Sequence, residues 1–109
     1  MNTPRWLGST TIGYQDGPFA TALFYFGIAA LVPDGAGNMY VLDAYNYALR
    51  KVDLTTNTVS TVFKGTSGYA DGSFQEAKMN VASDMALDKE GNIYIVDPGN
   101  KAIRKVILK

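Results

Sequence analysis

Two pairs of polar residues offer the plainest candidate chemistry in this sequence. Asp43 is followed three residues later by Asn46, and Asp97 is followed in the same way by Asn100. Carboxylate and amide oxygens are ligands that Ca²⁺ accepts, so Asp43 and Asp97 are weak candidates for a metal site or for polarising a substrate. The same residue types also hold tight turns by hydrogen bonds to the backbone. Because the pair occurs twice in one pattern, we favour the turn-holding role and expect no metal and no other cofactor.

Composition excludes several kinds of chemistry. The sequence has no histidine and no cysteine, which rules out zinc–thiolate sites, imidazole ligands, cysteine nucleophiles and Ser–His–Asp catalysis within it. Ten basic residues balance ten acidic ones, so no broad field favours nucleic acid or an anionic membrane as a partner. No apolar run reaches the roughly 18–20 residues that span a bilayer. The sequence indicates no compartment.

One pattern of motifs occurs twice in the sequence. Residues 14–17, Tyr-Gln-Asp-Gly, recur as Tyr-Ala-Asp-Gly at 69–72, and the Gly-Asn of residues 37–38 recurs at 91–92. The Arg-Lys-Val of residues 50–52 recurs at 104–106. A period of this size is typical of stacked supersecondary units, none of which buries its apolar faces alone.

Short apolar segments predict that these units are built of strands. The segments are rich in β-branched and aromatic residues and are bounded by Gly, Asn, Asp or Pro. Gly and Asn in the connections at 34–38 and 88–92 tolerate the positive φ that a tight hairpin requires. The fold class is therefore all-β and antiparallel, and the expected strands are residues 26–32, 39–42, 48–54, 58–63, 82–87, 93–96 and 102–108.

Three motifs carry a resemblance to a known family. They are Tyr-x-Asp-Gly followed by Phe, then Asp-x-x-Gly-Asn-x-Tyr, then Asn-x-x-(Ile or Leu)-Arg-Lys-Val, each present in both copies. In this respect the sequence resembles NHL repeats over most of its length. The resemblance implies four-stranded antiparallel blades of a β-propeller, usually six to a ring, closed by a displaced outer strand.

The order of the expected strands divides the chain into three parts. Residues 4–8, with Trp6 and Leu7, form an outer closing strand; residues 14–64 form the first blade; and residues 69–109 form a second blade without its own outer strand. Both faces of a propeller blade pack on neighbours, so two blades alone would expose large apolar faces. We expect three identical chains to close a six-bladed ring, with the strand of Trp6 and Leu7 completing the second blade of the next copy. The alternative is that these residues are a piece of a longer propeller.

Differences between the two copies identify the candidate binding residues. Tyr25, Tyr45 and Tyr47 occur in the first copy at positions where the second copy has Asn80, Gly99 and Lys101. By propeller geometry these positions share one loop face, where aromatic rings can stack on a sugar, a peptide or a partner's side chains. The alternative role is local packing.

We therefore expect a non-catalytic scaffold that binds itself and a protein or glycan on one loop face. A calcium-dependent, lactonase-like propeller hydrolase is one alternative, and it would recruit the Asp–Asn pairs described above. The other alternative is a propeller fragment with no activity of its own.

Overall fold

A computed structural model describes residues 7–8, 11–25, 28–65, 83–98 and 101–108. Within these ranges the chain consists of antiparallel strands and one short 3₁₀ turn, which confirms the all-β prediction. No helix in the described ranges is long and apolar enough to cross a membrane. The elements are β1 (Gly17–Pro18), β2 (Ile28–Pro33), β3 (Asn38–Asp43), η1 (Ala44–Asn46), β4 (Ala48–Asp53), β5 (Thr58–Lys64), β6 (Asp84–Leu87), β7 (Ile93–Asp97) and β8 (Ala102–Val106).

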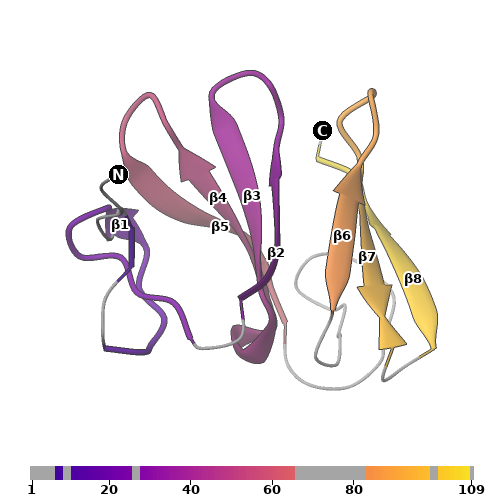
Figure 1. The fold of residues 1–109 in the computed structure, drawn as a ribbon, viewed down its shortest axis with the longest axis horizontal. Coiled ribbons are helices and arrows are strands. Elements are labelled where there is room, and N and C mark those ends of the chain that lie inside the picture. Colours follow the sequence, from indigo (N-terminus) through magenta and orange to yellow (C-terminus); the bar gives the residue numbers. More distant parts are fainter. Residues whose placement is uncertain (1–6, 9–10, 26–27, 66–82, 99–100, 109) are drawn as a thin grey trace, which may run out of the picture.

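The first sheet has the order β1-β5-β4-β3-β2 and the second has the order β6-β7-β8 (Figure 1). The meander β2-β3-β4-β5 agrees with the strands expected from the sequence to within two residues at each described end. The sequence did not predict β1, which pairs with β5 through Gly17 opposite Val59 and Pro18 opposite Thr58. An edge strand tolerates Pro because one side of its backbone has no partner.

The hairpins of the two copies are built alike. The Asp34 carboxylate accepts bonds from the backbone N–H groups of Ala36 and Asn38, and Asp88 accepts them from Glu90 and Asn92. The N–H of Ala36 is the main cause of a lowered pKa for Asp34, and the N–H of Asn92 is the main cause for Asp88. The repeat seen in the sequence is thus a repeat in structure.

The two sheets pack face to face, and their shared core lies between them (Figure 1). Alternate residues of each strand point to opposite faces, so the first sheet has a second apolar face as well. The shared core contains Tyr40, Leu42, Leu49, Phe63, Met85, Ile93, Ile95 and Val106. The opposite face of the first sheet is covered by the segment before β2, through Phe19, Ala22 and Phe24 over Val41, Val52 and Val59.

The expected closing strand at 4–8 falls mostly outside the described residues, and Trp6 lies in the undescribed part. Leu7 is described, is not in a strand, and packs on the face of the first sheet that points away from the second.

Candidate binding site at the η1 end of the first sheet

The site is defined by the end of the first sheet at which β3 finishes, η1 turns the chain, and β4 begins. We call this the η1 end; the hairpins at 34–38 and 54–57 lie at the other end (Figure 1).

Arg50 of β4 lies beneath this end and is completely buried. One guanidinium nitrogen donates to the Leu23 carbonyl at 2.7 Å and to the Asp43 carboxylate at 2.9 Å. The other donates to the Gln15 carbonyl at 2.8 Å and to the Asp16 carboxylate at 2.9 Å. The guanidinium carbon also lies 4.7 Å from the centre of the Tyr14 ring and 4.6 Å from that of Phe24. These contacts tie the segment before β2 to the sheet.

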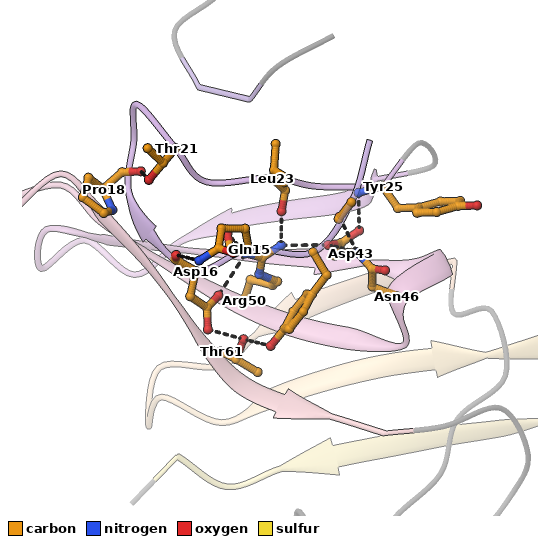
Figure 2. Close-up of polar contacts among 12 residues, drawn as sticks. Gln15, Asp16, Pro18, Thr21, Leu23, Tyr25, Asp43, Asn46, Arg50 and Thr61 are labelled. Atoms are coloured by element: carbon orange, nitrogen blue, oxygen red, sulfur yellow. Dashed lines mark hydrogen bonds and ion pairs between the residues drawn. The ribbon is translucent and has the colours of Figure 1, made fainter. Parts of the chain in front are cut away.

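The carboxylate of Asp43 is hydrogen-bonded to Arg50 in β4, to Asn46 in η1 and to the backbone of Tyr25 (Figure 2). Oδ1 accepts the backbone N–H of Tyr25 at 3.3 Å, and Oδ2 accepts the Asn46 amide at 2.8 Å along with Arg50. The same Asn46 amide nitrogen donates to the Gly13 carbonyl at 3.0 Å. Asp43 and Asn46 thus bond each other across the turn, but their backbone partners, Tyr25 and Gly13, lie on the segment before β2, and the Asp43 side chain does not cap η1.

Tyr25 and Tyr45 come together at the surface of this end. Their ring centres are 6.4 Å apart and the ring planes are tilted by 36°. The Tyr45 residue is 46% exposed, and Tyr25 is half-buried. Tyr47 ends η1 in the left-handed conformation with φ 53°, and its N–H donates to the Ala44 carbonyl. Of the three candidate tyrosines, the structure joins two in a ring pair and gives the backbone of the third a turn role.

The second copy forms the same turn without these aromatic side chains. Lys101, at the position of Tyr47, has φ 54° and donates its N–H to the Pro98 carbonyl. Asp97 is completely buried, and its carboxylate lies 3.7 Å from the Arg104 guanidinium. Asn80, Gly99 and Asn100 lie outside the described residues. At the Tyr47 position, then, the turn geometry does not require an aromatic residue.

Sequence reasoning missed the role of Asp16. Its carboxylate bonds Arg50 through one oxygen and accepts the Thr61 hydroxyl at 2.8 Å through the other. The Thr61 hydroxyl is also bonded to that of Tyr14. The sequence did contain a signal for the contact between Asp16 and Arg50, because the Tyr-x-Asp-Gly and Arg-Lys-Val motifs occur together in each copy. The two carboxylates that Arg50 contacts, those of Asp16 and Asp43, both belong to the first copy.

The surroundings of Asp43 do not favour a Ca²⁺ site. Both oxygens of Asp43 are used by protein donors, and Asp43 and Asp97 each face an arginine. Within the described ranges, no cluster of three or more Asp, Glu, His or Cys residues is placed to hold a metal ion.

Comparisons with known proteins identify similar chains but no family. No protein-family model matches the chain. It is 29% identical over 97 residues to the Arabidopsis thaliana protein SUPPRESSOR OF QUENCHING 1, chloroplastic, covering 88% of this chain and 9% of that protein.

Solved structures give a closer likeness. A Bacteroides thetaiotaomicron VPI-5482 protein of unknown function matches with a TM-score of 0.81 and 37% identity, over 91% of this chain and 26% of that one. Two auxiliary nutrient binding proteins also match. The one from the same organism has a TM-score of 0.72 and 28% identity over 87% of this chain, and the one from Bacteroides ovatus ATCC 8483 has 0.73 and 25% over 90%. Each match spans 26% of the solved protein, so this chain is similar to about a quarter of each.

Proposed function

We propose that this chain is a non-catalytic binding scaffold made of two blades of a β-propeller, with its ligand held at the η1 end of the first blade. The observation that carries the proposal is the Tyr25–Tyr45 ring pair, in which Tyr45 is exposed, beside a buried Asp43–Arg50 network. Two of the similar solved proteins are described as nutrient binding proteins, which supports a binding role. We propose no catalytic role, because Asp43 and Asp97 are each engaged by an arginine.

The open face of the second sheet supports the propeller part of the proposal. In the first sheet, Leu42 and Leu49 are completely buried against the second sheet. Their counterparts in the second copy are Val96 and Ile103, which pair with each other across β7 and β8 and are 39% and 73% exposed. The apolar face that the first sheet buries against the second sheet is thus exposed on the second sheet itself. This favours the packing of another sheet of the same kind against it.

The surface that would meet this face is present on the first sheet. Met85 of β6 is buried in the core between the two sheets. Its counterpart Leu31 of β2 pairs with Val41 as Met85 pairs with Ile95, yet Leu31 is 53% exposed. Leu31 of one copy and Ile103 of another would then share one core, as their counterparts Met85 and Leu49 do inside the chain. We propose that three copies of this 109-residue chain close a six-bladed ring through this heterologous contact.

The equivalence of the two copies also suggests where residues 4–8 would lie in the proposed ring. Val62 and Phe63 of β5 pack into the core against the second sheet. Leu7 packs on the corresponding face of the first sheet, where the outer strand of a preceding blade would lie. In the proposed ring, Trp6 and Leu7 therefore complete the second blade of the neighbouring copy.

A binding screen tests the scaffold role. The chain is titrated calorimetrically with neutral oligosaccharides, acidic oligosaccharides and short peptides, and so are the Tyr45→Ala and Leu54→Ala variants. Leu54 is also exposed but follows β4 at the opposite end of the sheet. The proposal expects at least one class to bind, with loss in Tyr45→Ala and no change in Leu54→Ala. Binding by no class, or equal binding by both variants, would contradict it.

A further inference from the structure

We infer that the Tyr25–Tyr45 pair is a platform for the sugar rings of a neutral oligosaccharide. The inference rests on the proposed function and adds to it the chemical class of the ligand. Three observations support it: the geometry of the ring pair, the hydrogen bonds that fix the two segments carrying the rings, and the contacts already made by the charged groups nearby.

The ring pair has the shape and the chemistry of a sugar platform. A pyranose has an apolar face of C–H groups and a rim of hydroxyls, and a tyrosine offers an apolar ring face together with one hydroxyl. Tyr45 is among the large apolar side chains that are well exposed, so its ring is accessible. The ring centres, 6.4 Å apart, are separate enough to meet different sugar units. The tilt of 36° between the ring planes suits a chain that twists from one unit to the next.

The platform is assembled before the ligand arrives. Tyr25 and Tyr45 come from different segments, and the Asp43 carboxylate bonds both segments: it accepts the backbone N–H of Tyr25 and the side-chain amide of Asn46, which lies next to Tyr45 in η1. Asp43 is itself fixed by Arg50 and Asn46. A ligand that docks on preformed rings avoids the entropic cost of ordering them, which matters most for a weak, small-area contact.

The charged groups near the platform are engaged by other protein groups. Asp43 and Arg50 are both completely buried and bonded to each other. Lys64, an exposed cation whose ammonium group reaches η1, donates to the Asn46 carbonyl at 3.0 Å and lies 4.8 Å from the centre of the Tyr14 ring. A uronic acid or a phosphate would have to draw Lys64 away from these two contacts, which favours a neutral ligand.

The size of the surface favours a small ligand over a protein. A stable protein interface buries roughly 800 Å² on each side and is anchored by several clustered residues. Among the described residues, the large exposed apolar side chains near this end include Tyr45, Ile28, which pairs with Asp43 at the start of β2, and Ile12, which precedes Gly13. These few side chains match a few sugar units.

The test is calorimetric titration of the 109-residue chain with a set of neutral hexasaccharides of glucose, mannose and xylose, in α- and β-linked forms. At least one should bind, and Tyr45→Ala and Tyr25→Ala should each weaken it by about tenfold, the loss expected for one stacking ring. Tyr45→Phe should keep most of the affinity because it keeps the ring. Leu54→Ala is the matched surface control and should be unchanged. Light scattering on each variant checks that assembly is the same.

The outcomes separate this inference from the proposed function. If acidic sugars or peptides bind through Tyr45 and neutral hexasaccharides do not, the scaffold role stands and the neutral-sugar inference is wrong. If neutral hexasaccharides bind equally well to Tyr45→Ala, the platform is in the wrong place. If no class binds at millimolar concentration, both proposals fail.

Discussion

Arg50 keeps its charge inside the protein because its surroundings supply acceptors and aromatic rings together. Two carboxylates, two backbone carbonyls and two rings surround it, while its Nε makes no hydrogen bond. Buried ion pairs add little to stability compared with a well-packed apolar core, but breaking one is costly since the remaining charge has no partner. Arg50 is therefore a positioning residue: it bonds Asp43, and Asp43 bonds the backbone of Tyr25 and the side chain of Asn46 in η1.

Replacing Arg50 with Met should destabilise the protein by about 3–5 kcal/mol, because Asp43 would stay buried without its counter-charge. The matched control is Arg104→Met in the second copy, where the pair is longer, at 3.7 Å, and the arginine side chain is 11% exposed. Urea unfolding of both variants measures the difference. Arg50→Met should lose more, because Arg50 is the more deeply buried of the two, and equal losses at the two positions would contradict this expectation.

The turn aspartates predict an acid-sensitive fold. Bonds from backbone N–H groups, first among them those of Ala36, Thr55 and Asn92, lower the pKa of Asp34, Asp53 and Asp88 below 3.8. A carboxyl group whose pKa is lower in the folded state stabilises the fold above its unfolded pKa, about 3.9, and this contribution is lost as the pH falls through the folded pKa. The free energy of unfolding should therefore fall as the pH drops below about 4.

The variant Asp88→Asn should show a smaller acid loss than the unaltered chain, because its side chain no longer titrates. Glu90→Gln removes an exposed carboxylate from the same turn and serves as the control. Urea midpoints measured from neutral to strongly acidic pH decide the matter. A pH profile of Asp88→Asn that overlays the unaltered one would contradict the assignment.

At the level of the elements, the hairpins depend on glycine at positions of left-handed backbone. Gly37 has φ 93° and Gly91 has φ 88° in equivalent turns. Their surroundings differ: a Cβ at Gly37 would lie 3.3 Å from the Thr55 hydroxyl, while a Cβ at Gly91 would meet no atom within 4 Å.

Both Gly37→Ala and Gly91→Ala should lose about 1–2 kcal/mol from the strained φ. Gly37→Ala should lose more, because Thr55 must also shift. Thermal or urea unfolding of the pair of variants measures this, and the order of the two losses is the informative result. A larger loss at Gly91 would mean that the crowding at Gly37 is relieved without cost.

The strands and hairpins were predictable because their signals are local. Alternating apolar residues and Gly-Asn turns specify β2 to β5 and β6 to β8 from a few neighbouring positions each. The contacts of Arg50 were not predictable, since Asp16 and Leu23 lie on another segment and reach it only through the packing of that segment. Packing also decided which of the candidate tyrosines meet. The sequence predicted Tyr25, Tyr45 and Tyr47 as one group, and the structure pairs the rings of Tyr25 and Tyr45.

For the whole molecule, the two copies differ in how their equivalent faces are covered. Leu49 and Met85 are buried between the sheets, and their counterparts Ile103 and Leu31 are exposed. Buried residues in one copy with exposed counterparts in the other are expected when the two sheets are part of a larger stack. The neighbouring sheets of that stack would come from other copies of this chain or from further repeats of a longer chain.

Ile103→Glu and Leu31→Glu should each break the proposed contact between copies, because a buried unpaired carboxylate is strongly unfavourable. Each variant should lose assembly and keep its β-sheet circular dichroism, since both positions are exposed within one chain. Leu54→Glu, an exposed position away from both faces, is the control and should assemble normally. Assembly that survives both Ile103→Glu and Leu31→Glu would place the contact elsewhere.

The most direct test of the account is the absolute mass of the 109-residue chain in solution, by light scattering after size exclusion. The account predicts a mass near three times 11.8 kDa, with the exposed face of each second sheet covered by the first sheet of the next copy. A monomer of 11.8 kDa that is folded and stable across a wide concentration range would contradict it. The open face would then not be an interface between copies of this chain.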